Sequence, residues 1–280
     1  MDQSKVQSAP IVVITATDGP QHYWRELWHF KELFLLFAWR DLLVRYKQTL
    51  LGISWAIIRP LLTVLVFTLV FGKIAKLPSG DTPYALFVFA GMLPWQFFST
   101  SLTDAGNSLV ANANIVSKIY FPRLLMPLAS IAVCFVDAVI AGVIFLALML
   151  WYGVIPDWKI MFLPLFIIWL GLITVALSVW IAALNVTYRD FRYVVPFAVQ
   201  LGLYISPVGF SSEVIPEKWL WVFYLNPMAG VIDGFRWSIL GGNHALHFTP
   251  ILISVVLTFA LLLPGLNFFR KKEDSFADGI

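Results

Sequence analysis

Long apolar runs separated by short polar connections constrain this chain more than any other feature. Six of them, at about 53–73, 84–103, 124–151, 160–186, 194–211 and 249–269, approach or exceed the ~20 residues with which a helix crosses ~30 Å of hydrocarbon. Only 12% of the 280 residues are charged, against about 25% in a soluble domain. Lipid offers no hydrogen-bond partners to open backbone, and the runs lack the alternation of a transmembrane barrel. The sequence therefore predicts an all-α polytopic membrane protein with six transmembrane helices spanning 53–269.

The distribution of Lys and Arg predicts how these spans are oriented. An even number of spans places both termini on one side, and 14 of the 19 Lys and Arg residues fall on that side. The other five are Lys73, Lys76, Lys159, Lys218 and Arg236. Because positive charge is enriched in cytoplasmic loops, both termini are expected to face the cytoplasm.

The two ends of the chain are predicted to be tails. Residues 1–22 are polar and turn-rich without a cleavable signal peptide, and are expected to form a flexible cytoplasmic tail. Residues 270–280 are expected to form a second cytoplasmic tail. The single cysteine, Cys134, excludes an intramolecular disulfide and a cysteine-based metal cluster. No G-x-x-x-x-G-K-[ST] phosphate loop occurs, and no metal or cofactor is expected in this chain.

Residues 23–52, which end in "RDLLVRYKQTLLG", are too charged for a span and too apolar for a free loop. Apolar residues recur in this segment at helical spacing, at Leu27, Phe30, Phe34, Phe37 and Ala38. Its many aromatic residues suit the headgroup region. The segment is predicted to be an amphipathic helix in the cytoplasmic interface. Two interpretations stay open: a membrane anchor alone, or an anchor whose exposed face also grips a soluble partner.

The connection at 104–123, "DAGNSLVANANIVSKIYFPR", is predicted to contain a short amphipathic helix. Its apolar residues are spaced four, three and four, at Leu109, Ala113, Val116 and Tyr120. The opposite face is polar and almost uncharged, with Asn107, Asn112, Asn114 and Lys118. Such a helix either packs on the bundle or seats in a groove of a partner protein.

The connection at 212–248 is too long for a tight turn and too apolar for a solvated loop. It contains Trp219, Trp221 and, as a helix start, Asn226 and Pro227, since Asn caps a helix and Pro fits its first turn. A Gly-Gly pair at 241–242 is a helix stop. We expect two short re-entrant helices, in which Asp233 and Arg236, three residues apart, can pair.

Two charged residues lie inside predicted spans. Asp137 falls near the middle of the third span, where a carboxylate costs about 2.5–3.5 kcal/mol and should face the bundle interior or a wet cavity. It is interpreted either as a channel-lining or proton-linked group, or as a helix–helix hydrogen bond to Asn185, Gln200 or a Ser or Thr. Arg59 in the first span either snorkels to the headgroups or contacts a phosphate.

Three stretches resemble one family. "RDLLVRYKQTLLGISWAIIRPLLTVLVFTLVFGKI" (40–74), "IVSKIYFPRLLMPLASI" (115–131) and "LNPMAGVIDGFRWSILGG" (225–242) resemble, in order and spacing, the permease subunits of bacterial polysaccharide ABC exporters. The likeness covers about residue 30 to the C-terminus. It implies a type 2 ABC transporter in the bacterial inner membrane, which moves a lipid-linked polysaccharide (O-antigen, capsular polymer or teichoic acid). It also implies a homodimer and a separate ATPase subunit that holds ATP and Mg²⁺.

The resemblance also implies roles for particular residues. The 104–123 helix would be the coupling helix that receives the ATPase stroke, and the candidates for ATPase coupling are Asn107, Asn112, Asn114, Lys118, Arg40, Arg45 and Arg189. The two short helices would form the outer gate, with Trp219, Trp221, Asn226, Pro227, Met228, Asp233 and Arg236. Arg59, Asp137, Phe197 and Tyr204 are the candidates for contact with the channel contents or the lipid carrier.

Two other functional classes are weighed against an exporter. A polytopic enzyme acting on a polyprenyl carrier would need clustered carboxylates or histidines, but the four histidines are scattered and no DxD-like pair occurs. An ion-coupled secondary carrier often shows internal inverted repeats, and none is evident. The sequence therefore favours a transport subunit that is not itself an enzyme.

Overall fold

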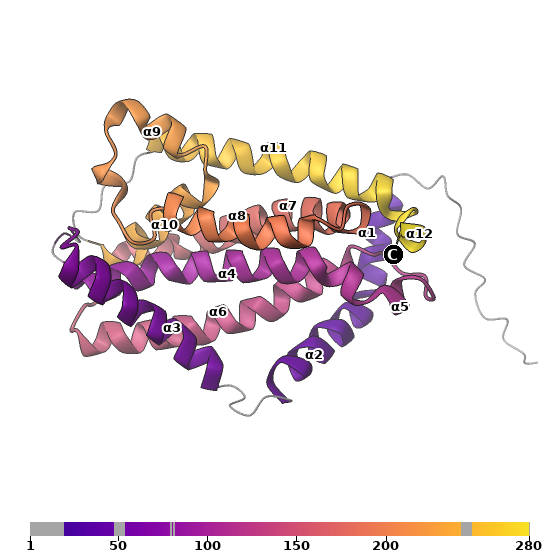
Figure 1. Cartoon of the computed structure of the whole chain (residues 1–280), viewed down its shortest axis with the longest axis horizontal. Helices are drawn as coiled ribbons and strands as arrows, with labels where there is room; N and C mark the ends of the chain where they lie inside the picture. The colour runs from indigo at the N-terminus through magenta and orange to yellow at the C-terminus, as the bar shows by residue number, and fades with distance from the viewer. Residues whose placement is uncertain (1–19, 48–53, 79, 81, 242–247, 280) are drawn as a thin grey trace, which may run out of the picture.

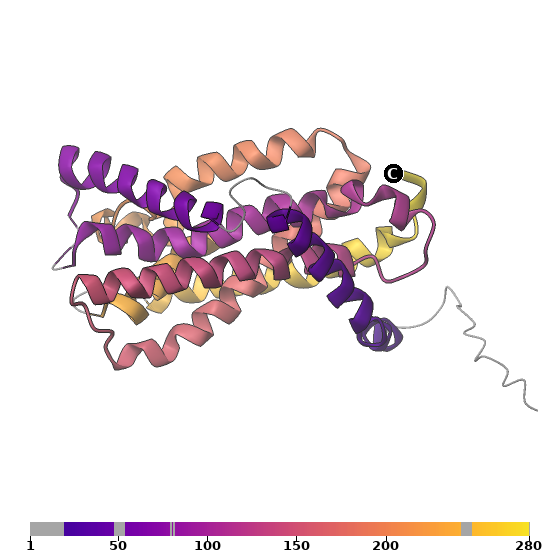
Figure 2. The ribbon, with the colours of Figure 1, turned by 90° about the horizontal axis from the view of Figure 1, so that it is seen from below.

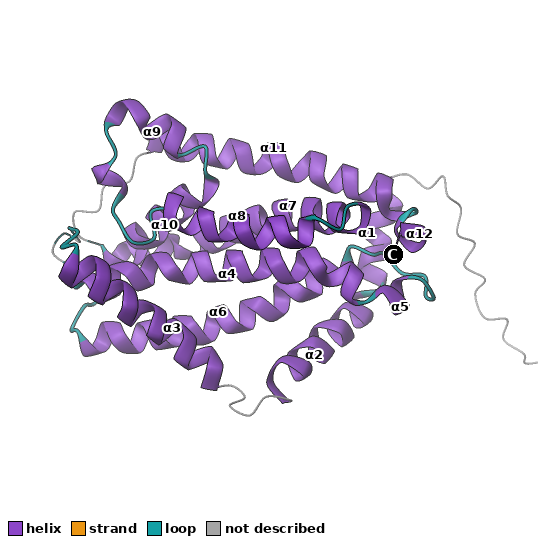
Figure 3. Ribbon diagram, viewed as in Figure 1, coloured by secondary structure: helices purple, strands orange, loops and turns teal. Residues whose placement is uncertain are grey.

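Helices account for every regular element in the described part of the chain (Figure 3). The computed structural model describes residues 20–47, 54–78, 80, 82–241 and 248–279. The tail predicted for residues 1–22 falls outside this range up to residue 19. Apolar helices run along the long axis of the molecule (Figure 1), with shorter helices at its two ends.

Five helical stretches are long and apolar enough to cross a membrane. They are α3 (Ser54–Phe67) with the π-helix η1 (Thr68–Ile74), α4 (Tyr84–Ala111), α6 (Leu125–Trp151), η2 (Trp158–Phe162) with α7 (Leu163–Thr187), and α11 (Phe248–Glu273). Their positions agree closely with five of the six predicted runs. α4 and α11 extend further than expected, by eight and four residues at their C-terminal ends.

The fifth predicted run, 194–211, forms the shorter helix α8 (Phe191–Ile205). Fifteen residues cover about 22 Å at 1.5 Å per residue, which is less than the hydrocarbon thickness. From Ser206 the chain continues through a turn toward the short 3-10 helix η3 (Ser212–Val214). A sixth crossing therefore stays a prediction.

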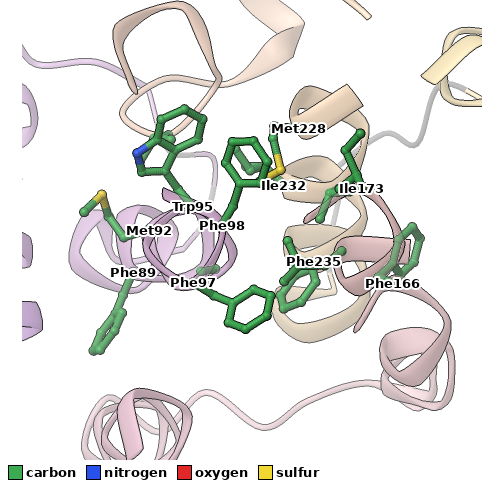
Figure 4. Packing of buried hydrophobic residues seen from close by; sticks show 14 of the residues in the cluster. Phe89, Met92, Trp95, Phe97, Phe98, Phe166, Ile173, Met228, Ile232 and Phe235 are labelled. Atoms are coloured by element: carbon green, nitrogen blue, oxygen red, sulfur yellow. The ribbon is translucent and has the colours of Figure 1, made fainter. Parts of the chain in front are cut away.

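The central helix α4 organises the core. Most of its length is buried, whereas few residues of α3 are buried. α4 packs against α6, α7 and α10 (Pro227–Leu240), and its aromatic residues project in several directions around the helix (Figure 4). On one side, Phe166 and Ile173 of α7 and Met228, Ile232 and Phe235 of α10 extend the same apolar cluster.

A second apolar cluster gathers the short elements at one end of the bundle. It joins Phe37 of α2 (Lys31–Lys47), Val116 of α5 (Ala113–Val116) and Phe276 of α12 (Phe276–Gly279) to the ends of the longer helices. α1 (Pro20–His29) lies at this end too, whereas α9 (Glu217–Phe223) and α10 lie at the opposite end (Figures 1 and 2). The two ends are called the α5 end and the α10 end.

The structure differs from the sequence prediction at the α5 end. The helix expected within 104–123 is divided, because α4 runs on to Ala111 and only Ala113–Val116 forms a separate turn of helix. Asn112 interrupts the helix with φ −110° and ψ 28°. Its side-chain nitrogen donates to the Ser108 carbonyl at 2.8 Å, which is the local competition with the backbone that makes Asn a poor helix-interior residue.

Two further segments differ from expectation at the same end. The predicted 23–52 helix is two helices, α1 and α2, and its residues 48–52 lie outside the described range. Within the tail expected at 270–280, the described residues are mostly helical: α11 continues to Glu273, and α12 follows at Phe276–Gly279. The Phe276 ring meets Phe269 at 5.1 Å between centroids. The burial of Phe276, which is 1% exposed, accounts for the order of this segment.

The helix signals at the α10 end are confirmed. α10 begins at Pro227, and the Asn226 side chain accepts a hydrogen bond from the Met228 backbone at 3.1 Å. The helix ends at Leu240, where Gly241 adopts φ 61°, a conformation that favours glycine. The preceding helix α9 is also present, so the chain forms the two short helices that were expected between α8 and α11.

The close approach of α10 to α7 generates a test of this packing. A Cβ atom at Gly234 would lie 2.0 Å from the Phe166 ring, whereas one at Gly171 meets nothing within 4 Å. We expect Gly234→Ala to cost about 1–3 kcal/mol through overpacking. The matched change Gly171→Ala should be neutral or stabilise the helix by up to ~1 kcal/mol. Thermal unfolding of the two variants in detergent measures the difference, and equal melting temperatures would contradict the packing described.

Candidate functional site

One arginine connects α2 to two of the long helices. Arg45 lies near the end of α2, and its terminal nitrogens donate to different carboxylates: Nη2 to Asp104 of α4, and Nη1 to Asp137 of α6. The three side chains are 29% to 35% exposed. A guanidinium suits this arrangement because its donors are held in a rigid fork. Arg45, Asp104 and Asp137 are together called the Arg45 bridge.

Tyr46 and Cys134 complete the surroundings of the Arg45 bridge. The Tyr46 hydroxyl donates to Asp137. Burial, together with this carboxylate, raises the pKa of Tyr46 above its usual value, so the hydroxyl stays protonated and remains a donor. The Cys134 sulfur lies 3.7 and 3.9 Å from the two terminal nitrogens of Arg45 and is 1% exposed. The guanidinium is therefore in contact with the buried thiol.

The partners of Asp137 are not those that the sequence suggested. Asn185 was one candidate, but its side-chain nitrogen donates instead to the Gly106 carbonyl at 2.8 Å and to Asn107 at 3.1 Å. Asp137 accepts hydrogen bonds from two residues of α2, Arg45 and Tyr46. The general expectation that a carboxylate within a span needs a partner is met by a helix that lies outside the spans.

The Arg45 bridge forms part of the wall of a cavity of about 360 Å³. α3 contributes Trp55, Arg59 and Pro60 to the lining, and α4 contributes Gln96 and Thr100. The Arg59 side chain is exposed at this position. Its placement is compatible with both interpretations given above, snorkelling and phosphate contact. Asp137 lines the same cavity, as expected of a carboxylate that faces a wet space.

The residues expected to couple to an ATPase divide into two groups. Arg40 donates to Asp41 at 2.7 Å and to Asn112, at the α4–α5 junction, also at 2.7 Å. Arg45 and Asn107 are likewise bonded within the chain. Asn114, Lys118 and Arg189 are exposed. The exposed residues are therefore the part of the predicted coupling set that presents side chains outward. Among the bonded residues, Arg40 joins α2 to Asn112 at the α4–α5 junction, and Arg45 joins α2 to α4 and α6. Asn107 joins α4 to Asn185 of α7.

Arg236 is the anchor of the α10 end. It is 2% exposed, and its three guanidinium nitrogens donate to the carbonyls of Phe87 at 3.2 Å, Phe210 at 2.9 Å and Val208 at 2.6 Å. The guanidinium carbon also lies 3.7 Å from the centre of the Phe87 ring, a favourable cation–π distance. Arg236 thereby joins α10 to α4 and to the turn that follows α8.

The other residues predicted for an outer gate occupy two environments. The Asp233 carboxylate is 7% exposed and accepts a hydrogen bond from the Tyr224 hydroxyl at 2.6 Å, and Met228 is buried in the core. Asn226 caps α10 and also donates to the Ser206 hydroxyl at 2.8 Å. Trp219 and Trp221 of α9 are exposed, as expected of side chains at a membrane interface.

Phe197 and Tyr204 lie on an exposed apolar face. These two residues of α8 are 62% and 64% exposed, and neighbouring positions on the face are Val194, Leu201 and Ile205. α3 and η1 expose a second apolar surface, which includes Leu61, Leu62, Leu65 and Val66 of α3 and Leu69 of η1. At the α10 end, the α3 residue Phe67 lies close to Gly209, in the turn that follows α8.

Sequence reasoning missed Asp104 and Tyr46. Asp104 was treated as the first residue of a connection, and only the structure shows that α4 continues past it. The available signal was the requirement that Asp137 have a partner; Arg45 was singled out in the sequence, but for contact with another protein. The contact between them is long-range, 92 residues apart, and no local spacing reports it.

Comparison with known proteins identifies relatives of this chain. A family model described as "ABC-2 type transporter" matches residues 32–240. An O-antigen export system permease protein RfbA from Klebsiella pneumoniae is 30% identical over 88% of this chain and 94% of its own length. An RfbA of Myxococcus xanthus is 26% identical over 91% and 98%. The polysialic acid transport protein KpsM of Escherichia coli is 24% identical over 84% and 92%.

The three carbonyl contacts of Arg236 predict a local effect. Arg236→Gln should leave at least one of the three carbonyls without a donor, at a cost of about 1–3 kcal/mol. The loss should loosen the turn at 206–210 more than the rest of the chain. Hydrogen exchange of peptides covering 206–212 measures this effect. Arg236→Lys, which keeps the charge but not the fork, should give an intermediate increase; unchanged exchange in both variants would contradict the anchoring role.

Proposed function

Because this chain belongs to the ABC-2 type transporter family, we propose that it is the permease of an ATP-driven exporter of a lipid-linked polysaccharide, O-antigen foremost, in the bacterial inner membrane. The observation that carries the proposal is the 30% identity to an O-antigen export permease over nearly the whole of both chains. Capsular polysaccharide, as in the KpsM relatives, and teichoic acid are the alternative cargoes. The chain is a transport subunit, not an enzyme.

The ATPase is a separate subunit in this proposal, and it supplies ATP and Mg²⁺. The α5 end is the cytoplasmic end, in line with the positive charge of its connections. The exposed side chains there, Asn114 and Lys118 beside α5 and Arg189 in the α7–α8 turn, form the contact with the ATPase. A four-residue helix with exposed polar side chains is small enough to enter a groove of a partner.

Two copies of the permease enclose the path of the polymer in this proposal. The exposed apolar surfaces of α3 and α8 face the second copy or the lipid, since no part of the chain that the structure describes covers either of them. Phe197 and Tyr204 would then present aromatic rings to the sugar units, and Arg59, at the cavity beside the Arg45 bridge, is the candidate for the phosphate of the lipid carrier. α8 and the turn after it complete the sixth crossing.

The α10 end is the outer end of the permease. α9 and α10 form re-entrant helices whose backbone ends are satisfied by the protein, as the Asn226 cap and the Arg236 contacts illustrate. The exposed Trp219 and Trp221 place α9 at the outer interface. The pair of helices closes the polymer path on the outer side and opens during export.

The proposal is tested by reconstitution with the candidate ATPase. The two proteins should purify together, and vesicles containing both should move labelled lipid-linked polysaccharide only with ATP and Mg²⁺. An ATPase variant that binds but does not hydrolyse ATP is the control. Transport by this chain alone, without nucleotide, would contradict the proposal and favour an ion-coupled carrier.

A charge reversal tests the proposed ATPase contact. Lys118→Glu changes an exposed charge at the α5 end and should weaken binding of the ATPase about fivefold, or ~1 kcal/mol. The matched change Lys218→Glu reverses an exposed charge on α9, at the opposite end, and should leave binding unchanged. Binding of the ATPase to permease in nanodiscs measures both, and equal effects of the two changes would refute the assignment of ends.

A further inference from the structure

The polar side chains of α2 contact different parts of the chain at two positions along the helix. Arg40 donates to Asn112, which lies between α4 and α5, and Arg45, five residues further on, reaches Asp104 and Asp137. Five residues of α-helix cover about 7.5 Å. α2 therefore contacts the segment proposed to meet the ATPase through Arg40, and contacts helices of the bundle through Arg45 and Tyr46. A displacement of that segment reaches α6 through α2.

The Arg45 bridge has one cation and two carboxylates, on helices α4 and α6. If the two helices separate, Arg45 can keep one carboxylate while it releases the other, so its own charge is not left without a partner. Removing the last partner of a poorly hydrated charge is costly, and the bridge avoids this cost in either arrangement. Two alternative pairings of similar energy are the property that a two-state element requires.

The bridge is also in contact with the only thiol of the chain, that of Cys134. The Arg45 nitrogens lie 3.7 and 3.9 Å from the Cys134 sulfur, and Cys134 lines the cavity beside α3. Cys134 lies on the same helix as Asp137, so a guanidinium that leaves Asp137 moves relative to this sulfur. The thiol also donates to Asp104 at 3.6 Å, so a displacement of Asp104 changes its surroundings too. The unmodified protein therefore contains a site-specific chemical reporter for the arrangement of the bridge.

We propose that Arg45 is a positioning residue of the transport cycle: its bridge to Asp104 and Asp137 closes in the resting state and opens on one side when the ATPase acts, so that α2 passes the displacement of the α4–α5 junction to α6. The proposal rests on the function proposed above. It differs from a purely structural role, in which the bridge would stay closed throughout the cycle.

The test uses the reconstituted permease–ATPase complex and N-ethylmaleimide as the probe of Cys134. Labelling of the permease, followed by mass spectrometry, should be slow without nucleotide and about tenfold faster during ATP turnover, because turnover populates an open state. Cys134→Ser gives the background. Equal labelling rates with and without ATP, in a complex that transports, would overturn the proposal.

Substitutions of Arg45 separate positioning from folding. Arg45→Gln should label rapidly in both conditions and should transport less polymer per ATP hydrolysed. Arg45→Lys, which keeps the charge but not the planar fork, should be intermediate in both measurements. Lys47→Gln removes an exposed charge two residues away on α2 and should match the unaltered complex. A normal ratio of transport to hydrolysis in Arg45→Gln would overturn the proposal.

If the Arg45→Gln variant does not assemble with the ATPase, the Asp104→Asn variant tests the proposal instead. This change weakens only one arm of the bridge and should raise the labelling rate without nucleotide severalfold; an unchanged rate overturns the proposal. The outcome is distinct from failure of the proposed function, which would appear as a complex that moves no polymer with ATP.

Discussion

Polar groups between these helices must find their partners within the protein, because lipid supplies none. Two arginines meet part of this requirement toward opposite ends of the bundle. Arg45 pairs with carboxylates of α4 and α6. Arg236 donates to one carbonyl of α4 and to two in the turn after α8. Both use the planar fork of the guanidinium to join elements that are distant in sequence. The packing around α4 buries apolar surface, and the two arginines join particular elements near the ends of this helix.

The local part of the architecture was predictable from the sequence. Apolar runs placed α3, α6 and α11, and the Asn226–Pro227 start and the Gly241 stop placed α10, because such signals act within one or two turns of the chain. The division of 104–123 was not predicted, since periodicity alone does not register the side-chain competition at Asn112. The extension of α4 past Asp104 was missed because the predicted span was placed by its apolar run, which ends before this charged residue.

The candidate site was predictable in its residues but not in its contacts. Arg45 and Asp137 were both singled out, one for a partner protein and the other for a channel, yet they bond to each other. The free-energy cost of placing a carboxylate in the membrane indicates that Asp137 needs a partner. That cost does not identify Arg45, which lies 92 residues away in the sequence. Family likeness places the chain among exporters, and the packing of α2 on α6 supplies the contact that the likeness does not.

The length of α4 has a mechanical consequence. Its 28 residues make a continuous rod of about 42 Å, gripped at one tip by the neighbours of Asn112 and near the other by Arg236 through Phe87. A helix that moves as one body displaces both of its ends together. In the proposed exporter, a displacement at the α5 end of α4 would therefore also reach the contacts of Arg236 at the α10 end.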